Sequence, residues 1–116
     1  MKRLGEAVTE HPAPGTLVAA LRGEVDVTNA EELVGQVAAE ATNEVERLVL
    51  DLSELSFLDS SGIRALIGLV RRVQARGALA VAVVPEGAPV ERIFEITRME
   101  ELVPLVRSRE EALGTP

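Results

Sequence analysis

The middle of the chain alternates between apolar, β-rich segments and one amphipathic helical segment. Residues 47–52 (Arg-Leu-Val-Leu-Asp-Leu) and 79–84 (Leu-Ala-Val-Ala-Val-Val) are largely apolar, which is typical of strands buried on both faces of a sheet. Gly77 lies just before the second segment and is suited to end a helix. Between the two segments, apolar residues recur at helical spacing: Ile63, Leu66, Ile67, Val70 and Val73. A strand, a helix and a strand in this order predict an α/β fold with a mostly parallel sheet.

Further elements precede this unit. Residues 4–21 are interpreted as two short strands joined by the turn-forming residues 11–15. Thr28, with Glu31 three residues later, has the spacing of a capping box and predicts a first helix that runs to about Asn43. The N-terminal pair of strands can add an antiparallel edge to the sheet.

Shorter elements follow it. Pro89 suits the first turn of a third helix, and residues 102–106 predict a last strand that Pro104 confines to an edge. Ser108 and Glu111 repeat the capping-box spacing and predict a short final helix. The expected order is β-β-α-β-α-β-α-β-α. We therefore expect a small mixed, mainly parallel sheet with helices packed mostly on one face.

Composition restricts the possible functions. The chain has 116 residues, near the commonest domain size. Its formal net charge of −7 and its lack of Tyr and Trp argue against nucleic-acid binding, which needs clustered basic and stacking aromatic side chains. It has no Cys, and its longest apolar run, residues 78–84, is far shorter than the roughly 18 residues of a membrane span. With no signal-peptide pattern, we expect a cytoplasmic protein without membrane insertion.

A candidate site lies at the sequence Phe-Leu-Asp-Ser-Ser-Gly, residues 57–62, where an apolar segment gives way to the long helix. Hydroxyls at this position meet free backbone N–H groups and the positive end of the helix dipole. A phosphoryl group attached there would be tolerated locally, yet it would change the surface charge sharply. The segment therefore suits a binding module that is switched by serine phosphorylation.

These residues also have an ordinary structural explanation. Asp59, Ser60 and Ser61 are all good helix N-caps, a role worth about 1 kcal/mol, and local evidence alone favours capping. Gly62 in the first turn is harder to explain, because a better helix former would be more stabilising by about 1 kcal/mol. The glycine indicates that something approaches the helix closely.

Three segments carry a resemblance to a known family. Residues 48–53 (Leu-Val-Leu-Asp-Leu-Ser), followed by residues 57–63, closely resemble the core of the STAS domain family, and more narrowly the bacterial anti-sigma factor antagonists. Residues 21–26 match that family's Gly-Glu-aliphatic-Asp segment before the first helix. The resemblance covers nearly the whole chain. It implies a single STAS domain over residues 1–116, with a core at about residues 4–113.

The resemblance also implies a mechanism. In this family, the hydroxyl directly after the Asp of the motif is phosphorylated by an anti-sigma factor that is itself a serine kinase. Carried over, the acceptor is Ser60, with Ser61 as the alternative. The unphosphorylated protein binds the anti-sigma factor and releases a sigma factor, phosphorylation breaks the complex, and a phosphoserine phosphatase restores it. A phosphate adds about −1.5 to −2 charges at neutral pH, so we expect exclusion of the partner rather than refolding.

The resemblance extends to the neighbouring residues. Asp26 and Asp59 resemble the family's acidic positions beside the acceptor, and with Gly62 they complete the expected partner-binding surface. Asp26 is equally well explained as a turn residue, and for Asp59 capping and presentation to the kinase are compatible. Arg64 lies one turn beyond Ser60, where it can contact a phosphate or the partner, although a solvated helix face is the favoured explanation.

Other functions lack the residues that they need. Asp51 ends a strand, as does the phosphorylated Asp of receiver domains, but those domains also need a catalytic Lys and here Lys2 is the sole Lys. The single His, His11, lies in a Pro-rich turn, and no glycine-rich phosphate loop is found. No enzymatic activity, cofactor or metal is therefore expected.

One alternative function remains open, and one departure from the family pattern is evident. The alternative is a STAS scaffold subunit of a stress-signalling or lipid-transport complex that has no serine switch. The departure is the sequence Thr-Arg-Met at residues 97–99, where such proteins often have a glycine that ends the third helix.

Overall fold

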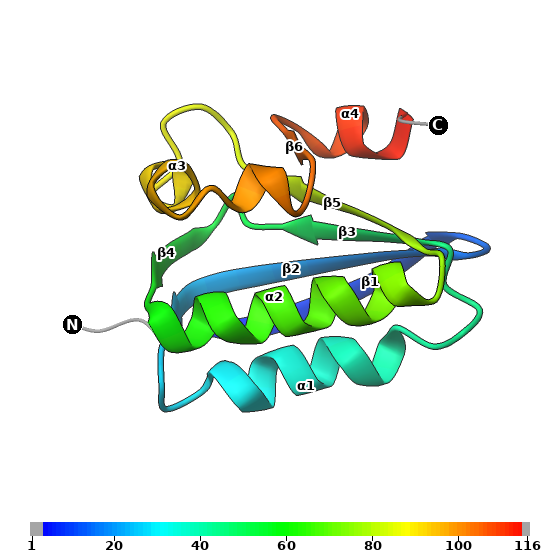
Figure 1. Ribbon diagram of the computed structural model, residues 1–116, viewed down its shortest axis with the longest axis horizontal. Helices are drawn as coiled ribbons and strands as arrows, with labels where there is room; N and C mark the ends of the chain where they lie inside the picture. Colours follow the sequence, from blue (N-terminus) through cyan, green and yellow to red (C-terminus); the bar gives the residue numbers. More distant parts are fainter. Residues whose placement is uncertain (1–3, 115–116) are drawn as a thin grey trace.

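The computed structural model describes residues 4–114 of the chain. Within these residues, six strands, four α-helices and one 3₁₀ helix follow one another (Figure 1). In chain order they are β1 (Glu6–Ala13), β2 (Thr16–Val25), α1 (Ala30–Glu40), β3 (Arg47–Asp51), β4 (Leu55–Leu58), α2 (Ser60–Ala75), β5 (Leu79–Val83), α3 (Glu91–Thr97), η1 (Met99–Glu101), β6 (Leu105–Val106) and α4 (Arg109–Gly114).

The strands form a mixed, mainly parallel sheet, as predicted. Its order is β1-β2-β3-β5-β6, and only the β1–β2 pair is antiparallel in the described part of the chain. Strand β4 was not expected as a separate element. It lies parallel to the C-terminal end of β2, residues 23–25, whereas residues 16–20 of β2 pair with β3. The long strand β2 therefore holds two different neighbours along one edge.

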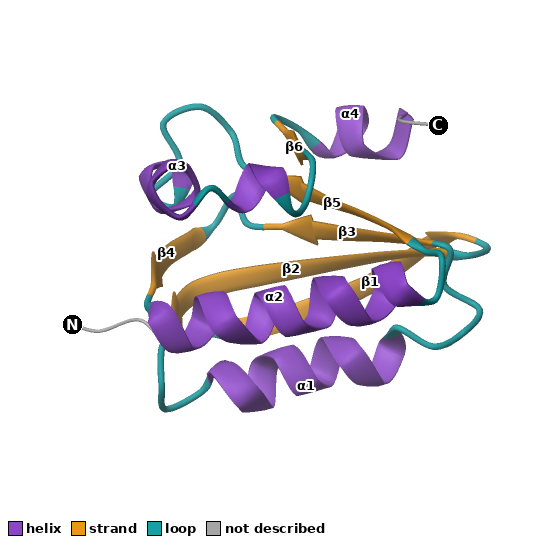
Figure 2. Cartoon of the chain, in the orientation of Figure 1, coloured by secondary structure: helices purple, strands orange, loops and turns teal. Residues whose placement is uncertain are grey.

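Helices cover the two faces of the sheet unequally (Figures 1 and 2). The buried residues of α1, α2 and α3 share one large aliphatic core with the sheet, and Phe94 is among its largest members. A smaller core on the other face joins Val18, Val49 and Val81 to Ala112 of α4. The prediction that most helices pack on one face is confirmed. Residues 48–51 of β3 are buried, as expected for a strand covered on both faces.

The start of α1 differs from the predicted capping box. The N-cap is Asn29, and the helix ends at Glu40 instead of near Asn43. The Thr28 hydroxyl donates to Asp26 Oδ1 at 2.5 Å and does not cap the helix. Asn29 makes no side-chain cap bond either, because its Oδ1 accepts from the Asp26 N–H and its Nδ2 donates to the Glu24 carbonyl, both at 2.9 Å. The side chains of Asp26, Thr28 and Asn29 thus stabilise the loop between β2 and α1.

Smaller differences concern the turns. Strand β1 continues to Ala13, so the turn of the hairpin is shorter than the predicted residues 11–15. A register shift between Glu10 and Ala13 accommodates Pro12 on this edge strand. Pro89 lies before the N-cap of α3, outside its first turn. The predicted cap of α4 is confirmed, since Ser108 Oγ accepts from the Glu111 N–H at 3.1 Å.

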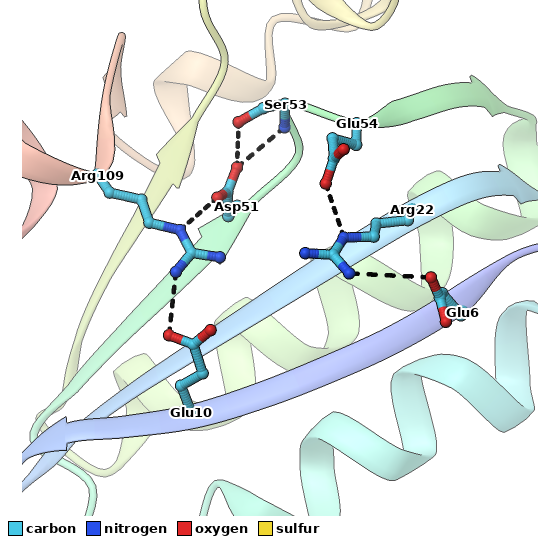
Figure 3. Close-up of polar contacts among 7 residues, drawn as sticks. All are labelled: Glu6, Glu10, Arg22, Asp51, Ser53, Glu54 and Arg109. Carbon is cyan, nitrogen blue, oxygen red and sulfur yellow. Dashed lines mark hydrogen bonds and ion pairs between the residues drawn. The ribbon is translucent and has the colours of Figure 1, made fainter.

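Asp51 anchors α4 to the sheet (Figure 3). Its Oδ2 accepts from Nε of Arg109, the first residue of α4, at 2.5 Å, while its Oδ1 accepts from the backbone and hydroxyl of Ser53. Arg109 also reaches Glu10 of β1 at 3.0 Å. Burial raises the pKa of Asp51, but the bonds from Ser53 and Arg109 outweigh it, and the pKa lies below its usual value of 3.8.

A second arginine, Arg22, links strand β2 to β1 and to the residue that precedes β4. Arg22 of β2 contacts Glu54, just before β4, with 2.7 Å between Nε and Oε2 (Figure 3). Its other end lies 3.9 Å from Glu6 of β1. Asp51 and Arg22 thus tie neighbouring strands and loops together by charge, in addition to the backbone ladder.

Arg98 ends α3 in the left-handed conformation, with φ of 56° and ψ of 36°. It is the sole non-glycine residue with positive φ among residues 4–114. The left-handed region costs an L-residue about 1–2 kcal/mol, and glycine is the usual solution at a helix C-terminus. The backbone of Arg98 is therefore strained, at the position where the family pattern led us to expect a glycine. By contrast, Gly77 has φ of 87° after α2, as predicted.

Asp51→Asn is expected to lower the free energy of unfolding by about 1–2 kcal/mol at pH 7, because Arg109 loses its buried counter-charge. The depressed pKa means that the carboxylate's contribution is present above about pH 3.8 and is lost as the pH falls through the lower pKa of the folded state. Urea unfolding across this range should show parent and variant converging at low pH. Glu10→Gln, at the exposed partner of the same arginine, should cost under about 0.5 kcal/mol. A difference for Asp51→Asn that did not vary with pH would contradict this account.

Arg98→Gly is expected to raise the free energy of unfolding by about 0.5–1 kcal/mol. The gain is the relieved left-handed strain minus the extra entropy that glycine adds to the unfolded chain. Arg98→Ala is the matched control, because it removes the same side chain but keeps the strain. Chemical denaturation of the three proteins measures the effect, and equal stability of the Gly and Ala variants would show that the backbone conformation is not strained.

Candidate functional site

The candidate site is built around the start of α2. Asp59 is the N-cap, and its Oδ1 accepts from the Gly62 N–H at 3.0 Å. This confirms the capping role predicted for Asp59. Its Oδ2 accepts from the Val27 N–H, in the loop between β2 and α1, at 3.1 Å. The backbone N–H of Asp59 also donates to the Val25 carbonyl at 3.3 Å. One residue therefore joins the beginning of α2 to the end of β2.

Asp26 lies in the same loop and is buried, with 8% of its surface exposed. Its Oδ1 accepts from the Thr28 N–H at 2.9 Å, next to the Val27 N–H that Asp59 holds. The two carboxylates thus accept from consecutive backbone groups of one loop. This geometry explains Asp26 as an organiser of the turn, one of the two interpretations that the sequence left open. It also places the loop against the start of α2.

The two serines differ in their surroundings. Ser60 is the first residue of α2 and is exposed, and its hydroxyl has no hydrogen-bond partner among residues 4–114. Ser61 is partly buried and lines a shallow cavity of about 360 Å³ with Val27, Ala30 and Arg64. Within the described chain, neither serine's backbone N–H has an acceptor. Ser60 therefore presents a free hydroxyl beside two free donors at the positive end of a helix.

Gly62 permits a close approach to the first turn of α2, as predicted from the sequence. The residue is buried, and a Cβ placed on it would lie 2.4 Å from Leu58 Cδ1 and 3.2 Å from Val25 Cγ1. The close approach that the glycine permits is therefore made by the protein's own core. Internal packing therefore accounts for the glycine, and the place of Gly62 in a partner-binding surface stays a prediction.

Arg64 lies one turn after Ser60 on the exposed side of α2 and forms part of the wall of the cavity that Ser61 lines. No ion pair or hydrogen bond holds its side chain within residues 4–114. The structure therefore leaves Arg64 free, in agreement with the favoured expectation of a solvated face.

Two apolar residues beside the serines were missed in the sequence. Val27 is 73% exposed and Phe57 of β4 is 47% exposed. Both flank the start of α2, since Val27 is bonded to Asp59 and Phe57 lies two residues before it. Val27 stands between two polar residues in a loop, and such a position for a large apolar side chain is the signal that could have identified it.

The site offers the Ser60 hydroxyl, free backbone donors and an apolar rim formed by Val27 and Phe57. Among residues 4–114, no group of three or more His, Cys, Asp or Glu side chains is placed to hold a metal ion. The arrangement suits covalent modification of a serine and docking of a protein surface.

A helix that crosses a bilayer must be both long and apolar. None of the helices formed by residues 4–114 has both the length and the apolar character needed to cross a membrane.

Comparison with known proteins identifies relatives across most of the chain. The family model described as STAS domain matches residues 8–112. The "Putative anti-sigma factor antagonist BtrV" of Bordetella bronchiseptica is 35% identical over 100 residues, which is 84% of each chain. The crystal structure of an anti-sigma factor antagonist from Mycobacterium paratuberculosis superposes with a TM-score of 0.77 at 25% identity, covering 97% of this chain and 96% of that one.

The fold also matches two structures of SpoIIAA, each at 23% identity, and the phosphorylated one is described as the Bacillus cell fate determinant. The unphosphorylated form gives a TM-score of 0.75 over 92% of both chains. The phosphorylated form gives 0.67 over 92% of this chain and 96% of that one. The family model and the relative from Bordetella, taken with the sheet order and the Asp59-capped helix, lead to one conclusion. The chain belongs to the STAS domain family, among the bacterial anti-sigma factor antagonists.

Proposed function

We propose that this protein binds an anti-sigma factor with serine kinase activity and thereby releases a sigma factor, and that phosphorylation of Ser60 ends the binding. The observation that carries the proposal is the exposed, unpartnered Ser60 hydroxyl at the Asp59-capped start of α2. The names of its relatives support the general role, since they are anti-sigma factor antagonists. A phosphoserine phosphatase would restore the binding form in the same cytoplasmic compartment.

Exposure favours Ser60 over Ser61 as the acceptor. A kinase must bring the γ-phosphate of ATP in line with the attacking hydroxyl, so the hydroxyl has to be reachable from outside. Ser60 is exposed at the first position of the helix, whereas Ser61 is partly buried and faces Val27 and Arg64 across a cavity. Ser61 is therefore the less accessible of the two hydroxyls.

The physical effect of the phosphate follows from its position. The free N–H groups of Ser60 and Ser61 and the helix dipole reduce the local cost of a phosphate but do not neutralise about two negative charges. A partner surface fitted to a neutral hydroxyl would then have to cover an unpaired dianion, which is strongly unfavourable. Asp59 and the apolar rim keep their places, so binding changes without a change of fold. Solved structures of SpoIIAA with and without phosphate, both similar in fold to this chain, are consistent with this view.

The acceptor assignment can be tested directly. When the protein is incubated with ATP and the anti-sigma factor kinase that it binds, we expect a single phosphate on the peptide that contains Ser60. Ser60→Ala should abolish the label, and Ser61→Ala, the matched control, should retain it. Peptide mapping by mass spectrometry measures both. A phosphate that persists in Ser60→Ala would refute the assignment, and capture of transporter subunits in place of a kinase would favour the scaffold alternative.

The charge mechanism has its own test. Ser60→Asp is expected to weaken binding of the anti-sigma factor at least tenfold, or about 1.4 kcal/mol, because a carboxylate is desolvated at the interface. Ser60→Asn has nearly the same size without the charge and should weaken binding much less. Calorimetric titration gives the dissociation constants, and circular dichroism should show the same fold for both variants. Equal weakening by Asp and Asn would mean that size, not charge, controls the complex.

A further inference from the structure

A groove runs between α1 and α2, which lie side by side on one face of the sheet (Figure 1). It consists of two shallow cavities of about 360 Å³ each, which adjoin because both are lined by Glu31 and Ala65. One end reaches Ser61, and the other end reaches Arg72 near the end of α2. The floor of the second cavity is apolar and contains Val34, Ala38, Ala65 and Leu69.

Two glycines in the groove have no explanation within the fold. Gly35 of α1 and Gly68 of α2 lie in helix interiors, where glycine is clearly less favourable than alanine. A Cβ built on either one would meet no atom within 4 Å. Gly62 is the contrast, because its absent Cβ makes room for Leu58. The space above Gly35 and Gly68 is open, so larger residues there would narrow only the groove.

The α2 wall of the groove carries positive charge without partners. Arg64 and Arg72 are exposed, and neither has an ion pair or hydrogen bond within the described residues. Arg76 on the same helix differs, because it donates to Asn43 Oδ1 and to the Ala41 carbonyl. The two free arginines are eight residues apart, or about 12 Å along the helix. They stand out on a chain of net charge −7.

We propose that this groove binds an amphipathic helix of the anti-sigma factor. An apolar seam of that helix lies over Gly35 and Gly68, and two acidic side chains seven or eight residues apart pair with Arg64 and Arg72. A neutral or basic residue faces Glu31 on the opposite wall. The proposal rests on the proposed function for the identity of the partner. It adds a second area of contact that begins at the serine and extends about 18 Å along α2, to Arg72.

This extension has a kinetic consequence. A contact 12 residues from Ser60 holds the substrate on the kinase but does not touch the reacting hydroxyl. Loss of the contact should therefore raise the KM for phosphorylation at Ser60 and leave kcat nearly unchanged. Loss of a residue that acts at the reacting atoms would lower kcat instead.

The decisive variants are Gly68→Leu, which fills the groove, and Arg72→Glu, which reverses its charge. Each should raise the KM for Ser60 phosphorylation at least tenfold with kcat within twofold of the parent. Arg71→Glu is the matched control: it makes the same change of charge on the same helix but lines a different cavity, beside Arg98 and Met99. Gly68→Leu should also melt at or above the parent's temperature, which separates a blocked groove from a damaged fold. An unchanged KM in Gly68→Leu, or an equal rise in Arg71→Glu, would overturn the proposal.

A second measurement separates failure of the groove from failure of the proposed function. The probe is a helical peptide of about 15 residues with leucines along one face, two glutamates eight residues apart and a lysine on the opposite flank. Titrated into the ¹⁵N-labelled protein up to about 1 mM, it should shift the amide signals of Gly35 and Gly68. In Gly68→Leu, the signal of Gly35 should no longer shift. If the kinase fails to label Ser60 but the peptide shifts these signals, the proposed function fails and the groove stands. If the peptide shifts neither signal, the groove proposal fails.

Discussion

The Asp59 carboxylate holds together the parts of the molecule on which the site depends. One oxygen caps α2 through Gly62, and the other accepts from Val27 in the loop after β2. Asp26 takes the next N–H of that loop. Because these bonds share one short loop, the end of β2, the start of α1 and the start of α2 are fixed relative to one another. The exposed position of Ser60 and the end of the groove beside Ser61 both follow from this arrangement.

The parts of the sheet and the helix boundaries that depend on short stretches of sequence could be predicted. The apolar runs of β3 and β5 identified two buried strands, and Gly77 and Ser108 marked helix boundaries that the structure confirms. Strand β4 escaped detection because it has only four residues, and both of its central ones, Ser56 and Phe57, are exposed. Its pairing with β2 depends on a long-range contact beyond the reach of local periodicity. The same applies to Asn29, whose side chain bonds to Glu24 and Asp26 rather than to its own helix.

The glycines show why a site cannot be inferred from spacing alone. Gly62 indicated a close approach without showing what makes it, and in the structure Leu58 and Val25 of the core make it. Gly68 attracted no attention in the sequence, yet nothing in the described structure occupies the space above it. Whether a glycine serves the core or an outside surface depends on which element crosses it, and that is a property of tertiary structure. The order Asp-Ser-Ser-Gly, in contrast, correctly predicted the cap at Asp59 because capping is decided within one helical turn.

The half-exposed side chain of Phe57 has a practical consequence. The chain contains neither Trp nor Tyr, so it is nearly silent in the near ultraviolet. Phe57 lies on β4, two residues before the capping Asp59, with 47% of its surface open. An indole introduced there would be the protein's sole strong fluorophore, located at the border of the serine site. Its emission would report the arrival and departure of a partner in real time, without an added dye and without background from the rest of the chain.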